Sequence, residues 1–509
     1  MSGYWAYMVV LLPQLGLLEQ DAMEVLSLIR SMKNHFAPIN RIPPEIFSLI
    51  PEYWDNSDMD EDLITMTHVC RGWRELLIAR TWLWARLDCT NVDKTHVYIE
   101  RAKLSPMKIS LFEDQDRPYL ERALLWAVPH FRRLKSLTIV GTSDLLQNLS
   151  KHLTLPTPLL GELIIDLTCN PAPVLDDMLF NGDLSSLRIL SLGGVVTNLP
   201  WKNLRSLTTF KLRCAPGNKI TVTHLLNFLQ NALHLRDITL DHSIPTSSNA
   251  PPSQMVLLPS LKRLTIIANP SHPILNHLCI PVGASLVLDF KFSGDKSPLL
   301  DLLPKTAKDH VYDVATVNLY FEKRKKFVQL IRPSGGLTIF GHWKDYVEMA
   351  PSHLLDSQIL QSLGQFHLGT AWRLAITKCG FPVPTEINKY PHYYILDRMR
   401  QLRTLTLIQC HNLPFILSLD PGRNPSGSVL CPELEELVLY IKARKLFNIV
   451  ELMKMAKERA SKNAKLSLIT IIGLDELIPG KEVFKLREHV TRVEHRFEGE
   501  PPRWDAIAN

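Results

Sequence analysis

The sequence predicts an α/β protein in which a small all-α N-terminal segment precedes a long, irregular body of short strands and helices. Three observations predict this organisation. Short helical stretches, one with a proline-marked start, occupy residues 40–84. From Leu134 onward an apolar-x-x-apolar-x-apolar pattern recurs nine times, and helical stretches separate several of its copies. Strands and helices that alternate in this way are typical of α/β architectures with parallel strands.

The composition of the 509 residues is that of a globular protein, with 46% hydrophobic and 21% charged residues. This length allows roughly two to four domains, or one small domain followed by a repetitive body. The formal net charge of +6 is mildly basic, and the longest dense basic run is Glu322–Lys326. One such run favours a solvated surface, whereas a nucleic-acid interface needs several clusters on one face. A nucleic-acid interface at Lys323–Lys326 is therefore a minor alternative, and no nucleic-acid partner is expected.

The eight cysteines are widely and irregularly spaced, at positions 70, 89, 169, 214, 279, 379, 410 and 431. A zinc site needs close ligand pairs, and no Cys-x-x-Cys pair is present, so the sequence predicts no metal site. A disulfide framework would need a higher cysteine density. The pattern indicates reduced thiols, which are typical of cytoplasmic or nuclear proteins.

Residues 1–37 are predicted to form a tail followed by an amphipathic helix. Residues 4–13 are apolar, but no Lys or Arg precedes them, and Pro13 and Gln14 interrupt the run. A signal peptide needs a basic start and a membrane span needs about 20 unbroken apolar residues, so we predict an unanchored tail and no membrane partner. Leu17–Phe36 has apolar residues at helical spacing and charged residues on the other side, which predicts a helix with one packing face.

Residues 38–90 are predicted to form a small helical domain. The stretch Asn40–Ile50 has two prolines at a helix start, where proline loses no helical hydrogen bond, and Glu45 in the first turn suits the helix dipole. An acidic insert, Asp55–Asp62, then lengthens the link to a second helical stretch at Leu63–Leu77. The domain ends on Thr81–Trp84.

At these residues the chain resembles a known family. Ile-Pro-Pro-Glu-Ile at 42–46, Val-Cys-Arg-x-Trp-Arg-x-Leu at 69–76 and Trp-x-Trp at 82–84 resemble the F-box, and the whole stretch resembles F-box-like proteins of mushroom-forming fungi. The resemblance implies a three-helix motif that docks a Skp-type adaptor and so joins a cullin–RING ubiquitin ligase. It also implies a set of adaptor-facing residues: Ile42, Pro43, Glu45, Ile46, Ile50, Val69, Cys70, Trp73 and Trp84.

The physical chemistry of so small a bundle also predicts a partner. Three short helices cannot bury all of their apolar residues among themselves, and isolated domains of this size are marginally stable. The surplus apolar surface must be covered by another protein or by the rest of the chain. For Ile46, Val69, Trp73 and Trp84, a place in the chain's own core is the alternative interpretation.

Residues 91–499 are predicted to form an irregular leucine-rich-repeat-like α/β solenoid, followed by a C-terminal tail at 500–509. The nine copies of the pattern begin at Leu134, Leu160, Leu187, Leu207, Leu235, Leu261, Leu402, Leu434 and Leu466. Most neighbouring starts are about 26 residues apart, within the range of leucine-rich repeats. Each copy is expected to be one strand, with helices at 118–126, 222–229 and 447–453.

The repeat pattern is imperfect. Regular repeats place Asn or Cys three residues after the last apolar position, where the side chain bonds the loop backbone, and only Asn269 and Cys410 do so here. The period is also lost between residues 281 and 395, where strand-like pieces occur at 287–290, 314–320 and 374–376. A non-solenoid α/β domain with many short strands is therefore the alternative.

The sequence shows no catalytic motif. It lacks a phosphate-binding Gly-x-x-x-x-Gly-Lys run, a Gly-x-Gly-x-x-Gly turn and a Gly-x-Ser-x-Gly elbow, and His489 and His495 are too far apart for a metal pair on one helix face. We predict a non-enzyme without catalytic, cofactor-binding or metal residues. The expected function is the substrate-recognition subunit of a Skp–cullin–F-box ligase, with an unknown target on the repeat body. The alternative is a repeat scaffold without ligase function, in which the F-box-like segment caps the first repeats.

Overall fold

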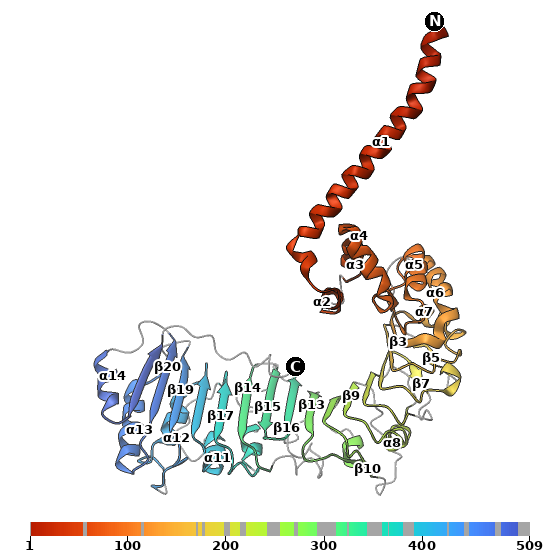
Figure 1. The fold of residues 1–509 in the computed structure, drawn as a ribbon. Helices are drawn as coiled ribbons and strands as arrows, with labels where there is room; N and C mark the ends of the chain where they lie inside the picture. Colours follow the sequence, from red (N-terminus) through yellow and green to blue (C-terminus); the bar gives the residue numbers. More distant parts are fainter. Residues whose placement is uncertain are drawn as a thin grey trace. The chain divides into compact units, whose positions relative to one another are not determined.

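The computed structural model of the chain divides into two compact units, Met1–Leu163 and Ile164–Asn509, which are described separately (Figure 1). An N-terminal helical region precedes a large mixed α/β region with a long, mainly parallel sheet, which confirms the predicted α/β class. The structure describes residues 2–53, 59–112, 117–168, 172–175, 179–197, 204–213, 220–241, 255–268, 273–292, 312–322, 325–343, 359–364, 366–379, 391–424, 427–441, 447–473 and 480–496.

The first unit begins with a long helix, α1 (Ser2–Phe36). We predicted a helix only from Leu17 and a tail before it, so the helix extends further toward the N-terminus than expected. Alanine, methionine and leucine in residues 4–13 favour a helix, and the helix continues through Pro13 although the proline ring removes one backbone hydrogen bond and crowds the carbonyl four residues earlier. From Gln14 to Phe36 every side chain of α1 is exposed. The predicted packing face therefore has no partner among the described residues.

Three short helices follow: α2 (Pro44–Leu49), α3 (Met59–Val69) and α4 (Arg71–Ala79). The 3-10 turns η1 (Pro38–Arg41) and η2 (Ile50–Tyr53) flank α2. The three helices share a small core that includes Phe47, Leu63, Met66 and Leu77. Of the acidic insert, residues 55–58 lie outside the described residues, and Met59–Asp62 form the first turn of α3.

The rest of the first unit alternates helices and parallel strands. The 3-10 turn η3 (Thr81–Ala85) leads into β1 (Arg86–Leu87), and β1, β2 (Met107–Phe112) and β3 (Leu134–Gly141) pair in parallel. Asn91 caps α5 (Val92–Ala102) by accepting a hydrogen bond from the Lys94 backbone amide. The other helical elements of this part are α6 (Arg117–Ala127), η4 (Val128–Arg133) and α7 (Ser143–Ser150).

All nine copies of the repeated pattern contain a strand. After β3, these are β4 (Glu162–Leu167), β6 (Ile189–Gly193), β8 (Thr209–Arg213), β9 (Asp237–Asp241), β11 (Arg263–Ala268), β18 (Thr404–Ile408), β19 (Glu436–Ile441) and β20 (Leu468–Gly473). The first leucine of most copies lies just before its strand and is buried, as at Leu187 and Leu402. The copies thus form strands with their leucines in the core, as predicted.

In the second unit two runs of parallel strands flank an antiparallel insertion. One run pairs β6, β8, β9, β11 and β13 (Ser285–Phe292), and the other pairs β17 (Arg373–Thr377), β18, β19, β20 and β21 (Arg492–Arg496). Between them lie β16 (Gly336–Trp343), β15 (Lys325–Ile331) and β14 (Thr316–Phe321), joined antiparallel in that spatial order. This insertion accounts for the loss of the repeat period in this region.

The turn between β15 and β16 depends on a glycine. Gly335 has a φ of +84°, and a Cβ at this position would lie 2.6 Å from the carbonyl oxygen of Ala284. Only glycine adopts this conformation without a steric penalty. The next residue, Gly336, begins β16.

The remaining described elements of the second unit lie beside this sheet. The helices are α8 (Val222–Gln230), α11 (Pro391–Arg398), α12 (Asn412–Leu419), α13 (Ile449–Ser461) and α14 (Gly480–Arg487). The short elements are β5 (Val174–Leu175), η5 (Leu179–Gly182), β7 (Val196–Thr197), β10 (Val256–Leu257), η6 (Pro273–His277) and β12 (Leu278–Cys279). The helices predicted at 118–126, 222–229 and 447–453 correspond to α6, α8 and α13. In Figure 1, α8, α11 and α12 lie along the same edge of the strand row.

Cys410 bonds the loop backbone in the way expected of its position after the strand. Its sulfur accepts a hydrogen bond from the Cys379 backbone amide at 3.4 Å and lies 3.2 Å from the carbonyl oxygen of Ile376. The contacts join the ends of the neighbouring strands β17 and β18. Asn269, the other residue at such a position, lies outside the described residues.

Two buried thiols lead to a prediction about pH. Burial raises the pKa of Cys89 and that of Cys431 to about 12, because a thiolate is poorly solvated there. The folded-state pKa of each thiol lies above its unfolded value. The contribution of the two protonated thiols to the free energy of unfolding is therefore complete below about pH 9 and is lost as the pH rises toward 12.

We therefore expect the free energy of unfolding to decrease between about pH 8 and pH 10.5, and to decrease less in a Cys89→Ala/Cys431→Ala variant. Urea unfolding at both pH values measures this difference. In the native protein at about pH 8, iodoacetamide should alkylate the half-buried Cys70 and leave Cys89 and Cys431 intact. Equal alkylation of all three thiols would contradict the placement of the two buried ones.

Candidate protein-docking site

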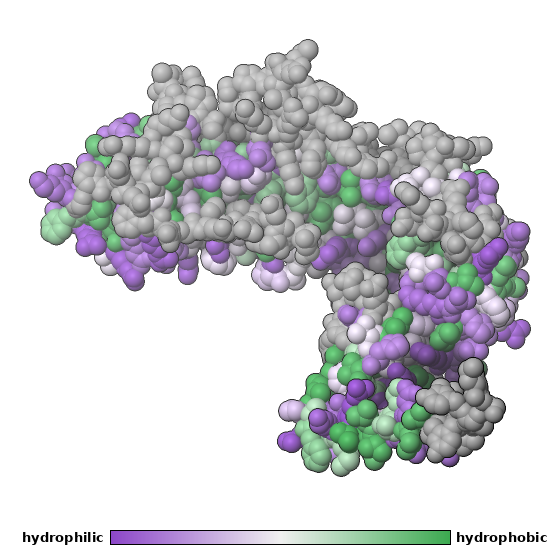
Figure 2. Space-filling view, turned by 90° about the horizontal axis from the view of Figure 1, so that it is seen from above, coloured by the Kyte–Doolittle hydropathy of each residue, from purple (hydrophilic) through white to green (hydrophobic). Residues whose placement is uncertain are grey.

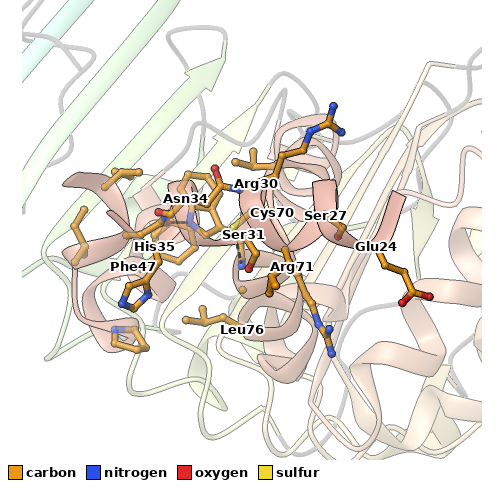
Figure 3. A pocket seen from close by; sticks show the side chains of 18 residues that line it. Glu24, Ser27, Arg30, Ser31, Asn34, His35, Phe47, Cys70, Arg71 and Leu76 are labelled. Carbon is orange, nitrogen blue, oxygen red and sulfur yellow. Dashed lines mark hydrogen bonds between the residues drawn. The ribbon is translucent and has the colours of Figure 1, made fainter. Parts of the chain in front are cut away.

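The F-box-like segment borders an open hollow of about 720 Å³. Its walls come from α1, from the η1–α2 segment and from the junction of α3 with α4 (Figure 3). Of the nine predicted adaptor-facing residues, the hollow is lined by Ile42, Val69, Cys70 and Trp73. The fold therefore brings residues from two separate stretches of the sequence to one surface.

Trp73 is held in a defined orientation within this surface. Its ring lies 4.5 Å from the ring of Phe47, centroid to centroid, and its indole N–H donates a hydrogen bond to Asn40 Oδ1 at 2.5 Å. The Asn40 amide in turn donates to the backbone oxygen of Asn34, at the end of α1. The indole is half-buried, so one part of it packs within the chain and the other part faces the hollow.

Cys70 sets the junction between α3 and α4. It lies in an extended conformation as the N-cap of α4, and its sulfur accepts a hydrogen bond from the Trp73 backbone amide at 3.5 Å. Arg74 Nε donates to the Thr67 backbone oxygen at 2.9 Å across the same junction. These bonds fix the turn that places Val69 and Trp73 on one side.

The outer surface of α2 adds a second exposed region. Pro43, Glu45 and Ile46 are exposed, Ile50 is half-buried, and none of the four lines the hollow. The side chain of Ile46 is 55% exposed, and that of Val69, at the end of α3, is 54% exposed. We expected exposed apolar residues here, because three short helices cannot bury all of their apolar side chains among themselves. Ile46 and Val69 are such residues.

Trp84 differs from the other eight predicted residues. Its side chain is 0% exposed, and its indole N–H donates to the Leu77 backbone oxygen at 2.9 Å. Its ring packs against Tyr98 at 5.0 Å and lies under the Arg101 guanidinium at 4.3 Å. The prediction of a direct adaptor contact at Trp84 is corrected: this residue joins the F-box-like segment to α5 and has no surface left for a partner.

Several residues of the site were not predicted from the sequence. Phe47 and Leu76 line the hollow beside the predicted residues, and one wall comes from α1, including Glu24, Ser31 and His35 (Figure 3). The helical spacing of α1 was visible in the sequence, but the six residues of α2 are too few for a periodic pattern to show which side faces inward. In Figure 2 hydrophobic residues gather where α1 and the short helices lie in Figure 1.

A surface cluster of titratable side chains in the second unit joins Lys378, Tyr320 and Glu322. Lys378 Nζ donates to the Tyr320 hydroxyl at 2.9 Å and to Glu322 at 3.1 Å. The hydrogen bond with Tyr320 raises the pKa of Lys378, and burial raises the pKa of Tyr320. Both groups therefore stay protonated near neutral pH, the opposite of what an activated base requires.

We expected the basic run at 322–326 to be a solvated surface, but one of its lysines is buried. Lys326 lies in β15 with 2% of its surface exposed, and its Nζ is 5.6 Å from the ring centroid of Phe321. The alternation of side chains along a strand turns this residue inward. Lys326 therefore has almost no exposed surface for the minor alternative, a nucleic-acid interface at Lys323–Lys326, and Lys323 and Arg324 lie outside the described residues.

Neither the known protein-family models nor the curated protein sequences contain a match to this chain. Across the described ranges, no group of three or more His, Cys, Asp or Glu side chains is placed to hold a metal ion. Among the described helices, none combines the length and the apolar character needed to cross a bilayer.

Proposed function

We propose that this chain is the substrate-recognition subunit of a Skp–cullin–F-box ubiquitin ligase. The observation that carries the proposal is the convergence of Ile42, Val69 and Trp73 on one open hollow, together with the exposed Ile46 on α2. A partner that covers these side chains removes apolar surface from water, which favours association. The F-box resemblance identifies that partner as a Skp-type adaptor.

The second unit would bind the target protein. Its strand row is proposed to be an irregular leucine-rich-repeat solenoid, interrupted by the antiparallel strands β14–β16. In this role the chain makes and breaks no bonds itself. It holds the target near the ubiquitin-charged enzyme and so raises the effective concentration of the target there. Such a receptor needs neither cofactor nor metal, and it would work in the cytoplasm or the nucleus.

The direct test is co-expression of the full chain with a Skp-type adaptor, followed by size-exclusion chromatography. We expect the two proteins to elute together, and a Val69→Asp variant to elute alone, because a charge at the hollow leaves an unpaired carboxylate in the interface. Val450→Asp is the matched control, since Val450 is a similarly exposed valine (61%) on α13. Separate elution of the unchanged chain and the adaptor would contradict the proposal.

A second candidate function is a repeat scaffold without ligase function, in which the F-box-like segment is an N-terminal cap. The packing of Trp84 on Tyr98 and the hydrogen bond between the hydroxyls of Thr81 and Ser105 favour it, because both join the segment to the elements that follow. The two functions use different ends of the segment. If the segment is only a cap, the Val69→Asp substitution should have no effect in the co-elution experiment.

A further inference from the structure

We propose that the exposed helix α1 pairs with α1 of a second copy of this chain, as an antiparallel two-helix coiled coil. Apolar residues recur along α1 with alternating spacings of three and four, the heptad pattern whose seam positions face a partner helix. From residue 18 onward this seam comprises Leu18, Ala22, Val25, Ile29, Met32 and Phe36.

The structure leaves this seam uncovered. Leu18 is 64% exposed and Met32 57%, and even Ile29, the least exposed large seam residue, is 44% exposed. None of the six seam residues lines the hollow, whose α1 wall is centred on the other side of the helix, at Ser27 and Ser31, and reaches the flank of the seam only at residues such as His35. Figure 3 shows Ser27, Ser31 and Asn34 on that wall. The seam is therefore free for a partner that does not occupy the proposed adaptor site.

A helix with so little burial needs a partner for stability. Isolated helices in water gain little from backbone hydrogen bonds alone, and most helical stability in proteins comes from packing of the apolar side. Gly16 also weakens the helix, since glycine is unfavourable in a helix interior by about 1 kcal/mol. Burial of the leucine, valine, isoleucine and methionine side chains against a second helix would supply the stabilisation that α1 lacks by itself.

Charge complementarity identifies a second copy, and an antiparallel one, as this partner. When Val25 of one copy packs on Ile29 of the other, the small Ala22 lies opposite the larger Met32. On one flank of the seam Glu19 then faces Lys33 of the second copy, and on the other flank Asp21 faces His35 of the second copy. Flanking charges of this kind set the partner and the orientation of coiled coils.

A parallel pairing fits this sequence less well. In register it places Ala22 opposite Ala22 of the second copy, and the flanking charges Asp21 and Lys33 each face a leucine. The charged residues of α1 between Leu15 and Phe36 are Glu19, Asp21, Glu24, Arg30 and Lys33, which gives no basic surface for an anionic membrane. The antiparallel dimer is therefore the arrangement that this helix favours.

The test uses sedimentation equilibrium of the full chain. The unchanged chain is expected to dimerise, and Ile29→Asp to weaken dimerisation at least roughly 30-fold, because each dimer then carries two charges in the seam. Gln20→Asp is the matched control: it also introduces a carboxylate in α1, but at the position facing away from the seam, so dimerisation should persist.

A charge exchange tests the orientation. Lys33→Glu alone should weaken dimerisation roughly five-fold, because it faces Glu19 of the second copy, and adding Glu19→Lys should restore it. Failure of the second change to restore dimerisation would overturn the antiparallel arrangement. A monomeric chain at all concentrations, or one that binds anionic vesicles through α1 as a monomer, would overturn the pairing. The co-elution experiment with the adaptor is independent of these outcomes.

Discussion

The double variant Ile46→Asp/Trp73→Ala is expected to lose co-purification with a Skp-type adaptor. Ile46 is 55% exposed on α2, and Trp73 faces the hollow while packing on Phe47. Truncation of a tryptophan hot spot at the centre of an interface costs about 2 kcal/mol or more, and a buried aspartate without a partner adds a further cost. The combined loss is on the order of 1,000-fold in affinity or more.

The single variants separate docking from folding. Trp73→Ala also removes the contact with Phe47 and the hydrogen bond to Asn40, so it lowers stability as well as affinity. Ile46→Asp removes little internal packing and should reduce adaptor binding while circular dichroism and the melting temperature stay unchanged. Leu257→Asp/Trp372→Ala is the control, with an exposed leucine (67%) and tryptophan (45%) in the second unit. Unaltered co-purification of the Ile46→Asp/Trp73→Ala protein would exclude this segment as the dock.

Replacement of the buried Arg459 by methionine is expected to destabilise the second unit. The arginine lies on α13 with 0% of its surface exposed, and its guanidinium donates to the backbone oxygens of Leu430 and Cys431 at 2.8 and 2.9 Å. Burial lowers the pKa of Arg459 to about 10, so the side chain remains charged at neutral pH. Methionine fills a similar space but leaves two buried carbonyl oxygens without these donors, at about 1–3 kcal/mol each.

Urea unfolding, monitored by circular dichroism, measures the effect as a lower transition midpoint. The expected change in the free energy of unfolding is on the order of 3 kcal/mol, because the lost hydrogen bonds are partly offset by the charge that no longer has to be desolvated. Lys457→Met is the control, since Lys457 is exposed on the same helix. A midpoint of Arg459→Met equal to that of Lys457→Met would show that these two bonds do not stabilise the fold.

The strands could be predicted from the sequence because their signal is local. In the copy around β19, Leu437 and Leu439 are two residues apart and so lie on the same, buried face of the strand, and Leu434 is buried just before the strand begins. The helix α8 was predicted in the same way, from the spacing of Val222, Leu225, Leu226 and Leu229, which are all buried. Patterns of this kind are complete within about ten residues, so neighbouring residues suffice to show them.

The spatial order of the strands was not predictable from such patterns. Strand β13 pairs with β16 rather than with β14, the next strand of the sheet along the chain, and β14 pairs with β17. The loss of the repeat period showed that residues 281–395 differ, but it did not show how they pair. Strand pairing depends on contacts between residues far apart in the sequence, for which a single sequence holds no local signal.

In the candidate site, the sequence by itself determined the residue types, the spacing of the tryptophans and one helix start, at Pro43 and Pro44 where α2 begins. Only the tertiary structure decided that Trp73 faces a hollow, that Trp84 is buried on Tyr98, and that α1 forms one wall while its apolar seam stays exposed. The physical reason is that helix formation follows from nearby residues, whereas the burial of a side chain depends on whichever distant element packs against it.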